Sequence, residues 1–355
     1  MTTILWTSGA VLIALTAWYT FWRIQARNFG TSGYVSPETS WFAKLCFAGI
    51  SRLVGFLTVG PITVIGAENV PRDARIIGVG NHQVKADFAV AQRAFGRHFR
   101  SLGAAAQFPG ITAMLAAWLG VIPVTYGSKE ERAHAEQACV SYLGGSNGWR
   151  RLSLAVVLIL SAVLTGAFVY ALCVGAGLGA MLSFLALCAV LSFPGGARAL
   201  LVAPQGALMP DNQLNPWEFR AGAVRMARCA VKVSRERVLI LPLGVLYKRD
   251  PKDAHWTHRF LKRTRSMFLG MRNPVYWNPL FKLDLNKLSA EERADVEAER
   301  AQALYAYEHS HITCYGAVVV VGKPIDPNDL AADPVEAIEQ IRLIIVDLLE
   351  EAAKH

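Results

Sequence analysis

A long uncharged segment constrains the fold of this chain more than any other feature. Residues 152–197 contain no charged side chain, and Arg150, Arg151 and Arg198 flank them. About 20 apolar residues cross a bilayer as a helix, so this segment is too long for one span. A glycine cluster at 175–179 divides it into two spans, which predicts a transmembrane helical hairpin whose ends lie on one side of the membrane. The alternative is a buried core hairpin, which requires protein to cover the whole segment.

A second apolar segment lies at the start of the chain. Residues 3–22 carry no charge, are long enough to span a bilayer, and are followed by Arg23 and Arg27. A cleaved signal peptide is the alternative, but the segment lacks a basic n-region and a small-residue cleavage site. We therefore expect residues 1–27 to be a transmembrane anchor. Residues 28–355 then form a domain, interrupted by the hairpin, that faces the cytoplasm from the inner (cytoplasmic) membrane.

Composition agrees with membrane residence. Hydrophobic residues make up 53% of the chain and charged residues 18%, which is more apolar and less charged than an ordinary soluble domain. The formal charge of +9 indicates an anionic partner, and the bilayer surface fits better than nucleic acid, for which the sequence carries no motif. The six cysteines are scattered without a C-x-x-C pair. We therefore expect neither a disulfide framework nor a metal site.

Residues 75–87 predict a short buried strand that passes through a Gly-Asn turn into a helix. His82 and Asp87 lie five residues apart in this stretch. On one continuous helix they would be about 140° out of register and could not pair. With His82 at the end of the strand and Asp87 in the first helical turn, the carboxylate can reach one imidazole nitrogen, and the other nitrogen becomes a general base. The chain has eight histidines, so a chance spacing is the alternative.

These residues resemble the glycerophospholipid acyltransferase family, of which the 1-acylglycerol-3-phosphate acyltransferases are the best-known members. The first motif of that family is His, four residues, then Asp, as in His82 to Asp87. Its third motif, Phe-Pro-Glu-Gly-Thr-Arg followed by Phe-Lys-x-Gly, is similar to residues 203–208 and 219–222. Here Gln205 stands in place of the usual glutamate.

The second and fourth motifs of the family are also similar to parts of this chain. A Gly-x-Ile-x-Val strand corresponds to residues 120–124, but Tyr126 stands where arginine is usual. An apolar strand with a central proline corresponds to residues 238–243. The resemblance covers roughly residues 60–250, and the hairpin at 152–197 is an insertion into it.

The resemblance implies an O-acyltransferase that moves an acyl chain from a thioester, acyl-CoA or acyl-carrier protein, to a lipid hydroxyl without a metal or other cofactor. The default acceptor is a lysophospholipid such as 1-acylglycerol-3-phosphate, in phospholipid biosynthesis. The arginines that hold a phosphate in the family are replaced here by Tyr126 and Leu208. This leaves a non-phosphate acceptor, a glycolipid or a glycosylated carotenoid, as the alternative. The resemblance implies that His82 and Asp87 are catalytic. The substrate-binding residues that we expect are Asn81, Lys85, Tyr126, Gln205, Gly206 and Arg220.

Two other functional classes are compatible with parts of the sequence. A non-catalytic lipid-binding membrane protein on the same scaffold would explain the departures in the second and third motifs, but both His82 and Asp87 are present. A small transporter would need polar or ionisable residues inside its spans, and the predicted spans contain no charged residue. The bilayer, the thioester and the lipid acceptor are therefore the expected partners, and the oligomeric state stays open.

Alternating strand and helix patterns predict an α/β fold, a mixed sheet flanked by helices and anchored in the membrane. Strands are expected at 121–124, 199–203, 237–247 and 317–321, in addition to the strand before His82. The apolar segment 41–59 predicts a helix that either lies on a membrane or packs on a core.

Overall fold

The computed structural model describes most of the chain outside the predicted membrane spans. The described residues are 16, 19–31, 34, 39, 41–108, 110–124, 129–145, 197–206, 209, 214, 219–234, 236–253, 273–309 and 314–355.

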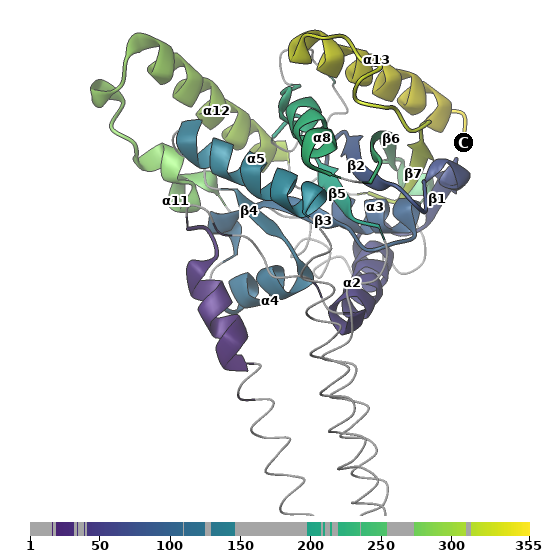
Figure 1. The fold of residues 1–355 in the computed structure, drawn as a ribbon, viewed down its shortest axis with the longest axis horizontal. Helices are drawn as coiled ribbons and strands as arrows, with labels where there is room; N and C mark the ends of the chain where they lie inside the picture. The colour runs from purple at the N-terminus through teal and green to yellow at the C-terminus, as the bar shows by residue number, and fades with distance from the viewer. Residues whose placement is uncertain are drawn as a thin grey trace, which may run out of the picture.

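Within these residues, seven strands form one mixed sheet in the order β1-β7-β6-β2-β5-β3-β4. Adjacent strands are parallel except for β6 and β7, which run antiparallel (Figure 1). The predicted mixed α/β sheet is therefore confirmed, and the sequence patterns missed two of its strands, β1 and β3. The strands are β1 (Ile62–Ile65), β2 (Arg75–Gly80), β3 (Arg100–Ala104), β4 (Ile122–Val124), β5 (Ala199–Val202), β6 (Val238–Lys248) and β7 (Gly316–Val321).

Helices cover both faces of the sheet (Figure 1). Helices α2 and α3 pack on one face, and α5, α8 and α13 pack on the other. Helix α12 follows the short helix α11 in the chain and lies beside α5 in Figure 1; none of its described side chains is fully buried. The bounds are α2 (Trp41–Val54), α3 (Asp87–Phe95), α4 (Ile111–Leu119), α5 (Lys129–Gly144), α8 (Gly222–Val233), α11 (Pro274–Trp277), α12 (Ala290–His309) and α13 (Pro334–Ala352).

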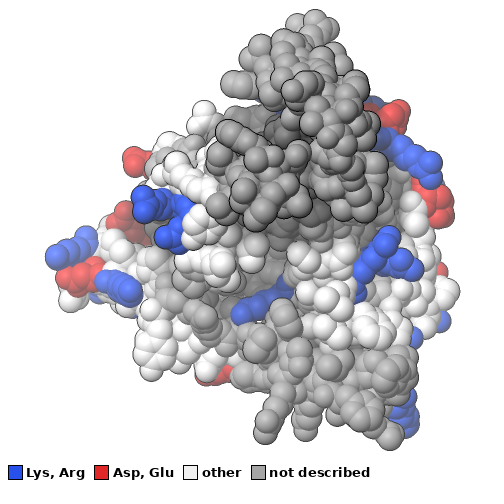
Figure 2. All heavy atoms as spheres, turned by 90° about the horizontal axis from the view of Figure 1, so that it is seen from below, with Lys and Arg blue, Asp and Glu red and all other residues white. Residues whose placement is uncertain are grey.

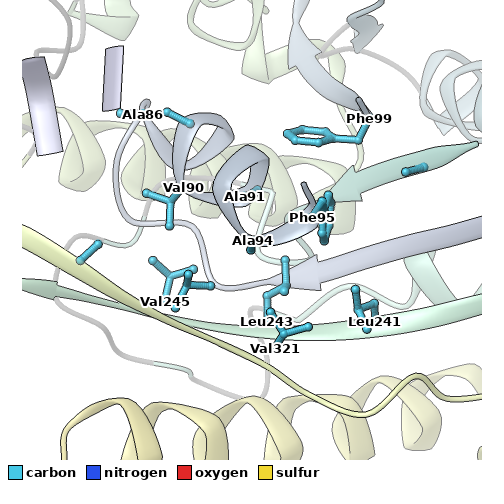
Figure 3. Packing of buried hydrophobic residues seen from close by; sticks show 14 of the residues in the cluster. Ala86, Val90, Ala91, Ala94, Phe95, Phe99, Leu241, Leu243, Val245 and Val321 are labelled. Atoms are coloured by element: carbon cyan, nitrogen blue, oxygen red, sulfur yellow. The ribbon is translucent and has the colours of Figure 1, made fainter. Parts of the chain in front are cut away.

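Strand β2 is buried along its whole length. Ile76 points into the core beneath α3, whereas Ile77 and Val79 point into the core beneath α5 and α8. Figure 3 shows the α3 side, where Val90 and Phe95 pack against β6. A side chain at Gly78 would collide with the Phe95 ring, so the glycine lets α3 approach the sheet closely. The strand that precedes His82 is thus held from both faces.

Helix α2 packs on the core with some of its apolar side chains and exposes others. Ala43, Phe47 and Val54 pack into the protein, whereas Leu45 and Leu53 are more than half exposed. After Val54 the chain continues as a π-helical turn, Gly55–Val59, in which Thr58 donates a hydrogen bond to the Val54 carbonyl. The predicted 41–59 helix is therefore an α-helix with a π-helical end.

The two predicted membrane segments lie largely outside the described residues. Residues 19–28 are helical, and the rest of the 3–22 segment is described only at residue 16. The 152–197 segment is described only at Ala197. The predicted domain boundaries at 27 and around the hairpin therefore stay predictions. Of the helices that the structure describes, none is both long enough and apolar enough for a membrane span.

The described residues on either side of the predicted 152–197 insertion lie next to each other. Arg198 Nη1 donates hydrogen bonds to the Gly145 carbonyl at 3.0 Å and to the Tyr142 carbonyl at 2.5 Å. Arg75 Nη2 also donates to the Gly145 carbonyl, at 3.4 Å. The chain thus leaves the domain and returns to it at one place, where two arginines satisfy carbonyls at the end of α5.

Candidate active site

The candidate site is the turn between β2 and α3, residues 81–87. Strand β2 lies between β5 and β6 and is parallel to both. The turn therefore starts at the carboxyl edge of the parallel strands, the edge where ligands gather in open α/β sheets.

The turn brings His82 and Asp87 together. His82 Nδ1 lies 2.6 Å from Asp87 Oδ2, and Asp87 is the first residue of α3. The backbone N–H of Gln83 donates to the same oxygen at 2.9 Å, and the helix N-terminus favours a negative charge there. The Asp87 side chain is 9% exposed and that of His82 is 30% exposed. The buried carboxylate thus holds one nitrogen of a partly exposed imidazole.

A second histidine, His98, lies away from this turn. His98 is buried, and its Nε2 lies 3.2 Å from the Leu119 carbonyl. The pKa of His98 is lowered to about 3, mainly by burial and to a smaller extent by Lys44 and Arg100, while the backbone hydrogen bond to Leu119 opposes the shift. His98 is therefore neutral at physiological pH and has a structural role.

Strand β6 holds the turn by running past the end of β2. The last pair between the two strands is Gly80 with Leu243, and β6 continues to Lys248. Asn81 exchanges two hydrogen bonds with the Val245 backbone, each 2.8 Å long. Gln83 Nε2 donates to the Val245 carbonyl at 2.8 Å, and Arg249 Nη2 donates to Gln83 Oε1 at 3.2 Å. Asn81 therefore acts as a structural bridge between the turn and the sheet.

Tyr247 is a site residue that the sequence did not indicate. Its hydroxyl donates a hydrogen bond to Asp87 Oδ1, the carboxylate oxygen that does not face His82. Burial raises the pKa of Tyr247 well above its ordinary value, and the Asp87 charge and hydrogen bond raise it further, so the hydroxyl is protonated. No local pattern could have indicated it, because Tyr247 and Asp87 are 160 positions apart in the chain.

The third motif supports the turn from β5. Gln205 is fully buried, and its Oε1 accepts a hydrogen bond from the His82 backbone N–H at 3.0 Å. The Met209 N–H donates to the His82 carbonyl at 2.6 Å. Gly206 is exposed with φ +69°, and its N–H donates to the Ala203 carbonyl at 3.1 Å within the turn. The structure thus places Gln205 against the His82 backbone, and Gly206 on the surface beside it.

Arg220 reaches the same edge from the start of α8. Its backbone N–H donates to the Pro204 carbonyl at 2.9 Å, and its guanidinium lies 3.5 Å from where a Cβ on Gly206 would be. The side chain is 44% exposed and forms an ion pair with Glu299 of α12, Nη2 to Oε1 3.1 Å. Arg220 is therefore a cation at the rim of the site that already has an acidic partner.

The remaining predicted site residues are Lys85 and Tyr126. Lys85 is half-buried within the 81–87 turn, and Tyr126 lies outside the described residues. In the part of the chain that the structure describes, no three histidine, cysteine, aspartate or glutamate side chains are grouped so that they could hold a metal ion.

A family comparison identifies the domain that carries this site. The sequence model of the family described as Acyltransferase matches residues 61–246, just over half of the chain, from β1 into β6. The chain belongs to the acyltransferase family. The family assignment predicted from the motifs is confirmed, and the protein is an acyltransferase enzyme.

Comparison with solved structures gives a distant match. A crystal structure of the 1-acyl-sn-glycerophosphate (LPA) acyltransferase PlsC from Thermotoga maritima is 13% identical, with a TM-score of 0.43 over 88% of this chain and 80% of that one. No curated protein matches this acyltransferase.

We predict that Asn81→Ala lowers both stability and activity, because it removes the two hydrogen bonds that Asn81 makes with the Val245 backbone. The loss should be about 1–3 kcal/mol, measured as a lower midpoint of thermal unfolding in detergent, with slower acyl transfer. Asn69→Ala is the matched control, since Asn69 Nδ2 donates one bond to the Val321 carbonyl at 2.8 Å, away from the turn. Asn69→Ala should lower the midpoint less and leave the transfer rate unchanged. An Asn81→Ala variant with wild-type activity would contradict the bridging role.

Proposed function

We propose that this acyltransferase uses His82 as a general base to acylate a lipid hydroxyl at a bilayer surface, with acyl-CoA or acyl-carrier protein as donor. The observation that carries the proposal is the 2.6 Å contact between His82 Nδ1 and Asp87 Oδ2, in a turn where the His82 side chain is partly exposed. With Nδ1 held by the carboxylate, Nε2 is the nitrogen that accepts a proton.

The reaction then needs no covalent enzyme intermediate. His82 Nε2 takes the proton of the acceptor hydroxyl as the oxygen attacks the thioester carbonyl carbon. The C–S bond breaks when the tetrahedral intermediate collapses, and the imidazolium returns the proton to the departing thiolate. Asp87 stabilises the imidazolium between these two proton transfers, in the role that the carboxylate has in hydrolase triads.

Exposed apolar residues support contact with a bilayer. Large hydrophobic side chains are exposed on α2, on the π-helical turn after it and on α4. Helices α2 and α4 lie on the lower side of the described domain in Figure 1. Seen from that side, the described surface is largely uncharged with blue basic residues among it (Figure 2). Arg52 is exposed on α2, and Arg23 and Arg27 are exposed on the helical residues 19–28. Such a combination suits an anionic lipid surface. The apolar residues are Leu45, Ile50, Leu53, Phe56, Ile111 and Leu115.

The hairpin proposal gains support from the ends of the insertion. Gly145 and Arg198 are in hydrogen-bond contact, whereas a single crossing would separate its ends by about 30 Å. We propose that the 152–197 segment crosses the membrane twice and that residues 1–27 cross it once. The catalytic domain then faces the cytoplasm.

Reporter fusions test this topology. A reporter at residue 1 should lie outside the cytoplasm, and reporters near Tyr126 and at His355 should both lie inside, because the arginine flanks stay on the cytoplasmic side. Protease protection that places Tyr126 and His355 on opposite sides would mean that the insertion crosses once.

The catalytic proposal predicts a large and specific loss of activity. His82→Ala should lower the acyl transfer rate by about 10²- to 10⁴-fold, and Asp87→Asn nearly as much, while both variants stay membrane-bound. The control is His134→Ala, since His134 is an exposed histidine on α5. It should transfer acyl chains at the wild-type rate in the same assay of labelled lipid products. Near-normal turnover by His82→Ala would overturn the mechanism.

The acceptor follows from the charge at the rim. We propose a lysophospholipid such as lysophosphatidic acid as the default acceptor, with Arg220 as the described cation nearest the third motif. The ion pair between Arg220 and Glu299 competes with a phosphate for the guanidinium. This competition favours the alternative, a neutral or sugar-bearing lipid hydroxyl, and predicts only a weak preference for phosphate.

Competition between lysophosphatidic acid and a neutral monoacylglycerol, with one acyl donor, measures that preference. We expect the wild type to prefer lysophosphatidic acid by less than about tenfold, and Glu299→Gln to raise the preference by releasing Arg220. Arg225→Ala is the matched control, because exposed Arg225 also pairs with a glutamate, Glu136. It should leave the preference unchanged. A preference above tenfold that Arg220→Ala abolishes would show that Arg220 binds the phosphate and that the neutral-acceptor hypothesis is wrong.

A further inference from the structure

The two oxygens of the Asp87 carboxylate have different hydrogen-bond partners. Oδ2 faces the imidazole of His82 at 2.6 Å and accepts from the Gln83 N–H at 2.9 Å. Oδ1 accepts from the hydroxyl of Tyr247. Tyr247 is 3% exposed and belongs to the core between the sheet and α3, so its ring cannot easily turn away.

We propose that Tyr247 is a positioning residue for acyl transfer, which fixes the rotation of the Asp87 carboxylate so that Oδ2 stays on His82. The proposal rests on the proposed role of His82 as general base. The hydroxyl of Tyr247 donates its hydrogen bond to Asp87, so Tyr247 acts through Asp87.

The physical argument concerns the last torsion of aspartate. Rotation about the bond between Cβ and the carboxyl carbon has a broad, twofold profile, so an aspartate side chain does not fix its own carboxyl plane. The N–H of Gln83 and the imidazole both approach Oδ2. A donor on the opposite oxygen, held by a rigid strand, fixes the plane from the other end.

The protonation state of Tyr247 suits this role. Burial and the neighbouring Asp87 charge raise the pKa of Tyr247 well above its ordinary value. The hydroxyl therefore remains a donor over the whole range in which an imidazole base works, and it adds no second negative charge beside Asp87.

Tyr247→Phe tests the inference because it removes the hydroxyl and keeps the ring. We expect kcat to fall by about 10- to 100-fold while KM for the thioester and for the lipid acceptor changes by less than about twofold. Tyr142→Phe is the matched control. Its hydroxyl is also buried and donates to the Ala199 carbonyl at 3.4 Å, at the start of β5 and therefore at the opposite edge of the sheet. Tyr142→Phe should leave kcat unchanged.

A double-mutant cycle with Asp87→Asn separates positioning from a structural effect. If Tyr247 acts through the carboxylate, Tyr247→Phe should lower the residual kcat of Asp87→Asn by less than about twofold. A full loss of tenfold or more in that background would overturn the proposal, since it would mean that the hydroxyl acts independently of Asp87. A Tyr247→Phe single variant with wild-type kcat would overturn it as well.

The same set of variants distinguishes this inference from the function on which it rests. An inactive His82→Ala together with a fully active Tyr247→Phe would refute the role of Tyr247 and leave the general base in place. An active His82→Ala would refute the general base itself. Thermal unfolding of Tyr247→Phe and Tyr142→Phe in detergent should give similar midpoints, so that a lost kcat in one of them reports on the site.

Discussion

The site depends on the extension of strand β6 beyond the end of β2. Where β2 stops at Gly80, its place beside β6 is taken by side chains: Asn81 and Gln83 bond to the Val245 backbone, and Asp87 bonds to Tyr247. These polar groups are buried, and a buried polar group without a partner costs about 1–3 kcal/mol. Strand β6 provides the partners: the Val245 backbone and the Tyr247 hydroxyl. These bonds hold the turn in shape while the His82 side chain stays partly exposed.

The opposite edge of the sheet also contains buried polar groups, but they have a structural role. Arg75 begins β2, Arg100 begins β3 and Arg198 precedes β5, so all three lie at the amino ends of parallel strands. Arg75 and Arg198 donate to carbonyls at the end of α5, and Arg100 lies 4.3 Å from the centre of the Tyr142 ring. Cations there donate hydrogen bonds to the last carbonyls of the helix, which have no partner within it, and they interact favourably with the negative end of the helix dipole. The amino edge thus secures α5 and the residues that border the insertion, and the carboxyl edge carries the proposed catalytic pair.

The described domain has both a buried core and exposed apolar side chains. The domain buries its sheet between two helical layers, and it exposes apolar side chains on α2 and α4 with exposed arginines near them. The ends of the insertion meet at the end of α5, so a membrane hairpin can be added there without changing the strand order. The proposed function uses this arrangement, because a lipid acceptor stays in the bilayer while its hydroxyl reaches His82.

The sequence by itself determined the features that depend on near neighbours in the chain. The contact between His82 and Asp87 could be predicted because a single strand-turn-helix brings the two residues together. The strand before them could be predicted from its run of apolar residues. The motifs also sufficed to assign the acyltransferase family, now shown by the family match. Strands β1 and β3 were missed because a strand of four or five residues, only partly buried, has too little alternation to stand out.

The tertiary structure determined which residues surround and support His82, Asp87 and Arg220. Tyr247 meets Asp87 across 160 positions, Gln205 meets His82 across 123, and Glu299 meets Arg220 across 79. Each contact requires a particular strand order and register, or a particular placement of α12. Local periodicity specifies which face of a strand is buried, but it does not specify which strand lies next to it. For that reason Gln205 could be predicted as a site residue from its motif, whereas its position beneath the His82 backbone followed from the pairing of β2 with β5.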